Sequence, residues 1–457
     1  MSDPKPPSPS APSHRRRKRA AWHRQADGAE GEQPPPILEH PRVPQGEPTL
    51  VDTAAGVAAL AARLREASLV GFDTEFIGEE TYRPRVCLVQ VATDREVALV
   101  DPLALEARGE IESLRDLYDA IASPNTITLV HAGFHDVEAI RLALEREPQR
   151  VVDTQVAAAM VGLAWPASLA TVLEALAGHR PGKAHTFTEW DARPLSHTQL
   201  LYAADDVRYL PLLWDRLAEA LESRDRLAWA IEESAARLAD APFDPRAQVK
   251  RIARADLVGL VNRSIITELV LERQAIARLH DVPPRAALPD AAVADIARAR
   301  PEDADALRRV KGIPGRTREQ CAEQLVAAVA RGIANPVEPD AIADAMGKRA
   351  IRAEVDRAWP QVPARCLELG LATELVISRA EFTSWFCREV AHRFDRPMKG
   401  AEVPSRESPF KPGTWRDTIL GEFMRELRAG IELPPEAEPK PRRRRRRRSQ
   451  GEDSAAG

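Results

Sequence analysis

The sequence predicts an α/β domain built around a mixed β-sheet, followed by an all-α region. Short β-rich apolar runs alternate with segments of helical periodicity in the first half of the chain. After about residue 245 the strand signals disappear, and only helical patterns interrupted by Pro and Gly remain. The chain has 457 residues, more than one ordinary hydrophobic core holds, so two or three globular domains are expected.

The strands of the α/β domain are predicted from runs of Val, Ile, Leu and Phe. Three of them follow one another as a meander, and a fourth lies between two helical segments, which indicates a mixed sheet flanked by helices. The predicted strands cover residues 68–76, 85–93, 96–102 and 125–132, and the predicted helices cover 114–123, 136–146 and one long segment from 196 to 223.

Composition divides the chain into five parts. Both ends are rich in Arg and poor in large apolar residues, so they are expected to be disordered, and they either attract phosphate backbones or are merely solvated. Seven consecutive arginines run from Arg442 to Arg448. The predicted parts are a tail (1–46), the α/β domain (47–240), a helical domain (245–335), a second helical domain (336–433) and a second tail (434–457).

Charge and cysteine content narrow the class of protein. The net charge of −4 conceals about −13 over residues 51–240 and about +4 over 241–335, as if one part holds cations and another holds polyanions. The four cysteines show no CxxC spacing, so neither a disulfide framework nor a zinc site is predicted. Without a long apolar run or a secretory start, a cytoplasmic protein with no membrane segment is expected.

Two carboxylates in a predicted buried strand raise the question of a cation. Asp73 and Glu75 in "VGFDTEFIG" are two residues apart, so both side chains point to the same face of the strand. Like charges side by side are unfavourable unless a cation lies between them.

Further acids follow at the ends of neighbouring elements. Asp136 comes where the strand ending in "LVHA" gives way to a helix, and Tyr202 and Asp206 share one face of a helix because they are four residues apart. Oxygen ligands without clustered His or Cys select Mg²⁺ or Mn²⁺. Two such ions can stabilise the attacking and leaving oxygens when a phosphodiester is cleaved.

Taken together, these motifs resemble those of a known family. "DTEF", the Asp after "VHA" and "YAADDV" are similar to the three exonuclease motifs of the DEDD superfamily, in its tyrosine-bearing branch. "FDTEFIGEETYRPRVCLVQVA", "VVDTQVAAAMVG" and "TEWDARPLSHTQLLYAADDVRYL" resemble ribonuclease D over about residues 50 to 235. The resemblance implies a ribonuclease H-like exonuclease fold. Residues 255–332 resemble its HRDC module, and residues 336–430 loosely fit a second HRDC-like domain.

The resemblance also implies roles for the acids. Asp73, Glu75 and Asp206 would hold a first divalent cation, with Asp73 bridging to a second that Asp136 supports directly or through water. Tyr202 would position the attacking water. Asp205 is also acidic, but the Tyr-x-x-x-Asp spacing selects Asp206.

Candidate substrate contacts are less specific. Phe76 either stacks on the terminal base or belongs to the core. His131 is expected to form hydrogen bonds or contact substrate rather than bind a metal ion, because no other nitrogen ligands lie nearby. In the family's "K…W..RPL" stretch, Lys183 would approach a phosphate, although the wording before Trp190 departs from the usual pattern. In the HRDC-like part, Arg308 and Lys311 either contact RNA phosphates or lie on a solvated basic face.

The expected function is therefore a metal-dependent 3′-to-5′ exoribonuclease that releases nucleoside 5′-monophosphates, with tRNA precursors the substrate the family suggests. Two alternatives are an exonuclease acting on DNA, since the acidic motifs do not read the 2′-hydroxyl, and a nucleic-acid-binding protein without activity. The presence of all four acids and the tyrosine argues against the last. The resemblance suggests a monomer.

Overall fold

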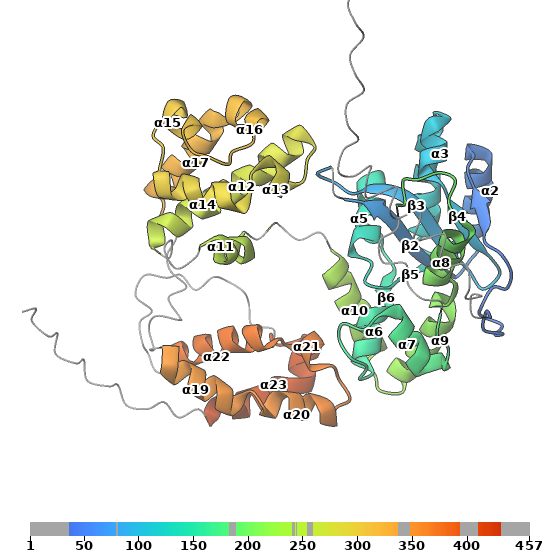
Figure 1. The fold of residues 1–457 in the computed structure, drawn as a ribbon. Coiled ribbons are helices and arrows are strands. Elements are labelled where there is room, and N and C mark those ends of the chain that lie inside the picture. Colours follow the sequence, from blue (N-terminus) through green and yellow to red (C-terminus); the bar gives the residue numbers. More distant parts are fainter. Residues whose placement is uncertain are drawn as a thin grey trace, which may run out of the picture. The chain divides into compact units, whose positions relative to one another are not determined.

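The structure is a computed structural model that describes residues 36–78, 81–181, 189–239, 243, 245–253, 259–336, 348–393 and 410–430 (Figure 1). The second predicted tail, most of the first, and Lys183 lie outside the described residues. The chain divides into two compact units, one of residues 1–337 with 367–375, the other of 338–366 with 376–457. Among the described helices, none is long and apolar enough to cross a membrane.

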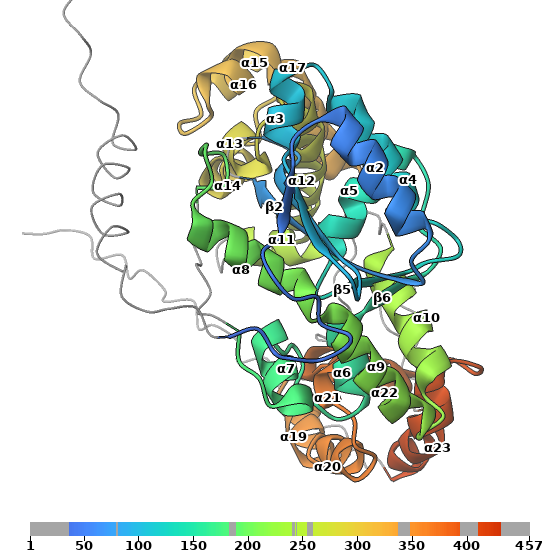
Figure 2. The ribbon, with the colours of Figure 1, turned by 90° about the vertical axis from the view of Figure 1, so that its right-hand side faces the viewer.

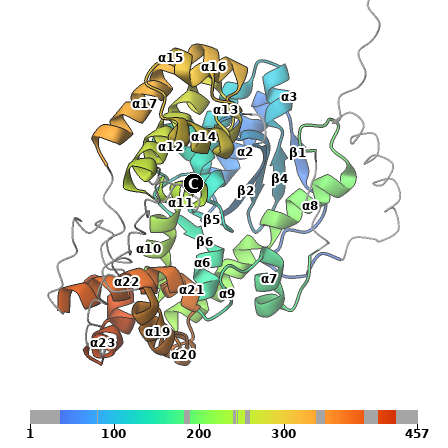
Figure 3. The same cartoon turned by 60° about the vertical axis from the view of Figure 1, so that its left-hand side comes forward.

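A six-stranded mixed sheet forms the centre of the first unit. Its order is β1-β4-β3-β2-β5-β6, and Figure 3 shows the strands running side by side. β2, β3 and β4 form the predicted antiparallel meander, whereas β1 pairs with β4, β5 with β2 and β6 with β5 in parallel. The strands are β1 (Thr49–Val51), β2 (Leu69–Ile77), β3 (Arg85–Ala92), β4 (Val97–Val100), β5 (Ile127–Val130) and β6 (Val151–Asp153). The mixed sheet is confirmed, and the sequence missed only the three-residue strands β1 and β6.

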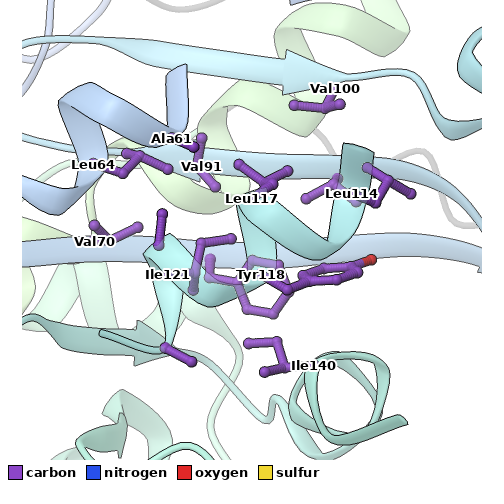
Figure 4. Close-up of a cluster of buried hydrophobic side chains, with 14 of the residues drawn as sticks. Ala61, Leu64, Val70, Val91, Val100, Leu114, Leu117, Tyr118, Ile121 and Ile140 are labelled. Atoms are coloured by element: carbon purple, nitrogen blue, oxygen red, sulfur yellow. The ribbon is translucent and has the colours of Figure 1, made fainter. Parts of the chain in front are cut away.

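Helices cover both faces of this sheet. Val70 and Phe72 on β2 belong to a buried apolar core shared with α2, α4 and α5. Figure 4 shows part of this core, with Val70 beside residues of α2, α4 and α5. On the opposite face lies α8, which contacts β2, β3 and β4 (Figure 2). The helices of this part are α2 (Ala54–Arg65), α3 (Pro102–Ala107), η1 (Ile111–Ser113), α4 (Leu114–Ile121), α5 (Phe134–Leu144), α6 (Thr154–Met160), α7 (Leu169–Ala177), α8 (His197–Arg208), α9 (Leu210–Glu222) and α10 (Leu227–Leu238).

The predicted helical segment over 196–223 is confirmed as helical, but the structure divides it at Tyr209 into α8 and α9. Ser196 begins α8 with a capping box, in which its hydroxyl accepts from the Gln199 amide and the Gln199 side chain accepts from the Ser196 amide. Pro211 lies in the first turn of α9 and has no N–H to donate to the carbonyl of Val207. That carbonyl accepts from the Tyr209 amide and lies close to Gly71 on β2.

The rest of the described chain is helical, as predicted. A second apolar core joins the helices from 246 to 334, with α12 packed along α17. These helices are α11 (Arg246–Ile252), α12 (Leu260–His280), α13 (Pro284–Ala287), α14 (Asp290–Ala299), α15 (Ala304–Arg308), α16 (Gly315–Gln320) and α17 (Ala322–Ala334). The remaining helices are α19 (Lys348–Ala358), α20 (Gln361–Glu368), α21 (Thr373–Val376), α22 (Arg379–Arg393) and α23 (Trp415–Ala429).

Candidate active site

Strand β2 carries the first two acids toward α8. Phe72 is fully buried in the core on one face of the sheet, so the strand alternation turns Asp73 and Glu75 to the other face. Gly71 lies on that same face, where an added Cβ would stand 3.0 Å from the carbonyl oxygen of Val207. The absence of a side chain at Gly71 therefore lets α8 lie close to the strand that bears both acids.

The third acid stands at the start of α5. β5 ends at Val130 while β2 continues, and the chain turns at Ala132 before α5 begins at Phe134. The carboxylate of Asp153 fixes this turn by accepting from the Ala132 amide at 3.0 Å. Asp136 is 6% exposed, and its Oδ1 accepts from the Thr74 hydroxyl at 2.5 Å. Asp136 is thereby held against β2, next to Asp73.

Helix α8 supplies the tyrosine and the fourth acid. The Tyr202 hydroxyl donates to the Asp206 carboxylate one turn further along the helix. The buried ring of Trp190 packs 6.2 Å from the Tyr202 ring, centroid to centroid. Asp205 instead accepts from buried Arg208 at 3.0 Å. The structure thus separates the two adjacent acids as the spacing predicted.

Burial raises the pKa of every acid of this cluster, and charge repulsion adds to the rise for Asp73, Glu75 and Asp206. Burial raises the pKa of Asp73 well above its usual value, and the charges of Asp136, Asp206 and Glu75 add to that rise. Burial followed by the charges of Asp206 and Asp136 raises the pKa of Glu75 to about 8. Burial also raises the pKa of Asp206 to about 7, although the Tyr202 hydroxyl opposes the shift. These mutual effects show that the four acids share one small region.

The donor set fits a hard divalent cation. Asp73, Glu75, Asp136 and Asp206 offer carboxylate oxygens only, which are the ligands that Mg²⁺ and Mn²⁺ prefer. In the part of the chain that the structure describes, no three His, Cys, Asp or Glu side chains converge closely enough to hold a metal ion. The assignment of a divalent cation to this site therefore rests on the carboxylate oxygens available and on the repulsion between these carboxylates, which a cation would relieve.

Phe76 lies beside this cluster but on the other face of the sheet. It is 37% exposed, so the interpretation as a core residue is wrong. Its ring contacts the ring of His135, with centroids 5.5 Å apart. Both rings line a cavity of about 460 Å³ whose wall also includes Thr74, Arg83 and Tyr118. Contact between Phe76 and a nucleobase stays a prediction.

His131 is engaged within the protein. Its Nε2–H donates to the carbonyl oxygen of Ala167 at 2.9 Å, and its Nδ1 lies 2.9 Å from the hydroxyl of Thr154. Burial lowers the pKa of His131, which favours the neutral ring. Both ring nitrogens are occupied, so the geometry supports the hydrogen-bonding interpretation and not the assignment of His131 to substrate.

The predicted phosphate contacts of the first helical domain are exposed. Arg308 ends α15 and donates to the exposed carboxylate of Asp305 at 2.7 Å. Lys311 follows in the turn before Gly312, whose φ of +80° suits a residue without a side chain. Exposure is compatible with RNA contact, which remains a prediction for both residues.

Sequence reasoning gave no role to two residues that build the site. Thr74 lies between the first two acids and holds Asp136, and the only signal was a hydroxyl residue inside an apolar strand. Arg193 donates through Nε and Nη2 to Asp101, at 2.6 and 2.7 Å, and through Nη2 to the carbonyl of Cys87. This pair anchors the segment that places Trp190 against Tyr202.

Comparison with known proteins identifies the family. A family model described as 3′-5′ exonuclease matches residues 48–222, and an HRDC domain model matches residues 262–329. A ribonuclease D from Gluconacetobacter diazotrophicus is 30% identical over 401 residues, covering 85% of this chain and 94% of the relative. Another, from a Jannaschia species, is 32% identical over 344 residues, covering 73% and 87%. The chain belongs to the ribonuclease D family.

A solved structure shows the same fold. The crystal structure of Escherichia coli RNase D, described as an exoribonuclease involved in structured RNA processing, aligns with a TM-score of 0.64 and 22% identity, covering 84% of this chain and 98% of that one. The mixed-sheet exonuclease fold followed by helical HRDC-type structure is thereby confirmed. As a ribonuclease D family member the protein is a 3′-to-5′ exoribonuclease, a hydrolase, and the exonuclease fold of this family implies dependence on divalent metal.

Proposed function

We propose that this member of the ribonuclease D family removes nucleotides one at a time from RNA 3′ ends, using two divalent cations held by Asp73, Glu75, Asp136 and Asp206. One observation carries the proposal: carboxylates from β2, α5 and α8 lie close enough that Asp136, Asp206 and Glu75 all raise the pKa of Asp73, and Asp136 also forms a side-chain hydrogen bond with Asp73. Mg²⁺ or Mn²⁺ bound there would stabilise the attacking and leaving oxygens of the phosphodiester.

The side chains around the cation site position the attacking water and the metal ligands. The Tyr202 hydroxyl, which donates to Asp206, orients the attacking water at the edge of the cluster. Trp190 packs against the Tyr202 ring and limits its rotation. Thr74 holds Asp136 in place through its hydroxyl. The products are nucleoside 5′-monophosphates, because the attacked phosphorus stays with the departing nucleotide.

The proposed substrates are structured RNAs with accessible 3′ ends, tRNA precursors among them. The family carries this suggestion, since Escherichia coli RNase D is described as acting in structured RNA processing. Exposed Arg308 and Lys311 supply positive charge outside the acidic site, where phosphates bind without repulsion. Hydrolysis of DNA remains the second candidate. Cytoplasmic location and a monomeric state stay predictions from the sequence.

The test is degradation of RNA labelled at either the 3′ or the 5′ end, with matched DNA, in Mg²⁺, Mn²⁺ or chelator. Wild type should shorten 5′-labelled RNA by single nucleotides only when metal is present, and act more slowly on DNA. Asp73→Asn should reduce the rate by about a thousandfold or more, since it removes a cation ligand. Asp205→Asn is the matched control, because its amide oxygen still accepts from Arg208.

The result separates the candidates. A 3′-trailered tRNA precursor should be trimmed to a discrete end, whereas an unstructured RNA of equal length should be degraded further. Equal rates on RNA and DNA would favour the second candidate. Binding of RNA with no metal-dependent cleavage would refute the catalytic proposal.

A further inference from the structure

Gln90 is a buried polar residue without a partner. It lies in the middle of β3, in a run of buried apolar residues, and is fully inaccessible to solvent. Neither its Nε2 nor its Oε1 has a hydrogen-bond partner in the described structure. Buried amides are nearly always hydrogen-bonded, so an amide with both ends unsatisfied calls for a specific explanation.

The strand register places Gln90 beside the acidic cluster. β2 and β3 are antiparallel, and Gln90 pairs directly with Asp73. Directly opposed residues share one face of the sheet, with Cβ atoms about 4.5–5.5 Å apart. A glutamine side chain is long enough to bridge that distance to a carboxylate.

The other neighbours of Gln90 on this face of the sheet give its side-chain amide no hydrogen-bond partner. On the far side Gln90 pairs with Leu99 of β4, which is apolar. Of the buried α8 residues, Ala203, Ala204 and Val207 have no polar side-chain atoms, and the guanidinium of Arg208 already donates to Asp205 and to the carbonyls of Pro44 and Gly46. Asp73 is thus the polar side chain directly across from the amide.

We infer that Gln90 is a positioning residue that donates a hydrogen bond from its side-chain amide to the Asp73 carboxylate when Asp73 binds a divalent cation. This inference rests on the proposed metal site. A ligating carboxylate uses part of its lone pairs on the cation and needs a donor to fix its orientation. Gln90 supplies such a donor without adding charge to a site that already holds four acids.

The test compares Gln90→Met with Leu99→Met in the full-length chain. Methionine keeps the length of glutamine and removes both polar atoms, and Leu99→Met introduces the same side chain on the same face, one strand further from Asp73. Mn²⁺ affinity is measured by electron paramagnetic resonance, thermal stability by circular dichroism in chelator, and kcat and KM on a labelled RNA.

Gln90→Met should weaken Mn²⁺ binding by about 10- to 100-fold and lower kcat with little change in KM, as second-shell changes do. Its melting temperature in chelator should be unchanged or higher, since replacing an unpaired amide by an apolar group of similar shape is not destabilising. Leu99→Met should bind Mn²⁺ as wild type does. If Gln90→Met does not fold, Gln90→Leu tests the same loss with a smaller side chain.

Wild-type Mn²⁺ affinity in a folded Gln90→Met would overturn the inference and leave the proposed function standing. Asp73→Asn measured in parallel distinguishes the other failure. If wild type binds no Mn²⁺ that Asp73→Asn removes, the metal site itself is refuted, and the role of Gln90 with it.

Discussion

At the scale of single residues, folding brings four carboxylates into a buried site where their ionised forms are unfavourable. Asp73 and Glu75 follow from strand alternation, and Asp136 is held by one hydroxyl, that of Thr74. Burial raises the pKa of all four carboxylates, so folding disfavours their ionised forms. The free energy that the fold loses there is recovered when cations neutralise the cluster.

This arrangement predicts a pH-dependent stability that metal removes. The folded-state pKa of Glu75 is about 8 and that of Asp206 about 7, both above the usual value near 4. The stabilising effect of protonation is therefore complete below about pH 4 and lost as the pH rises through about 8. In chelator, the melting temperature should fall between pH 5 and pH 9.

Excess Mg²⁺ or Mn²⁺ should raise the melting temperature most at the alkaline end, since binding requires ionised carboxylates. Thermal unfolding followed by circular dichroism, with and without metal, gives both curves. Asp206→Asn should reduce the change of melting temperature with pH in chelator, because it removes one of the titrating carboxylates. A melting temperature that increases with pH in chelator would contradict the explanation.

At the scale of elements, the position of α8 decides whether the site forms. α8 carries Tyr202 and Asp206, and it lies across β2, β3 and β4. Pro211 has no N–H to donate to the Val207 carbonyl, which lies near Gly71 on β2. Gly71 accepts this close approach because it has no side chain.

Gly71→Ala should therefore damage both stability and activity. The new Cβ would stand 3.0 Å from the Val207 carbonyl oxygen and 3.2 Å from the Leu210 Cβ, so α8 or β2 must shift. The expected cost is about 1–3 kcal/mol of unfolding free energy, as for other overpacked cores. Exonuclease activity should fall further than unfolding alone explains, because the shift moves Asp206 relative to Asp73.

Chemical denaturation and initial-rate measurements check this pair of effects. Gly315→Ala is the matched control, since nothing lies within 4 Å of the added Cβ and alanine favours the helix α16. Wild-type activity in Gly71→Ala would show that the approach of α8 is not critical.

At the scale of the whole molecule, charge is divided between parts of the chain. The exonuclease domain holds the acidic site, and the first helical domain exposes cations such as Arg308 and Lys311. Several arginines already have carboxylate partners: Arg308 donates to Asp305 at 2.7 Å, and Arg331 donates to Glu268 at 2.7 Å and to Glu272 at 2.9 Å. Only cations without such carboxylate partners have their full charge available for phosphates.

Lys311→Ala should weaken RNA binding and its dependence on salt. Losing one contact to a single-stranded phosphate lowers the slope of log K against log salt by about 0.7. Arg331→Ala removes a cation that two glutamates already neutralise, so it should leave this slope unchanged. Fluorescence anisotropy with labelled RNA across a salt series measures both. Equal slopes for Lys311→Ala and wild type would exclude Lys311 as a phosphate contact.

The sequence by itself determined the domain types, the meander of strands and the acids that meet at the site. These features are local, because strand alternation and the i, i+4 spacing of a helix can be recognised from residues that are close together in the sequence. They sufficed to select Asp73, Glu75, Asp136, Tyr202 and Asp206, which the structure brings together.

Only the tertiary structure decided how these residues are held. The Thr74–Asp136 hydrogen bond, the Arg193–Asp101 pair and the place of Gln90 beside Asp73 each join residues distant in sequence. The ring of His131 appeared available from its motif, yet Thr154 and Ala167 occupy it. Such partners depend on strand register and helix packing, which no local pattern specifies.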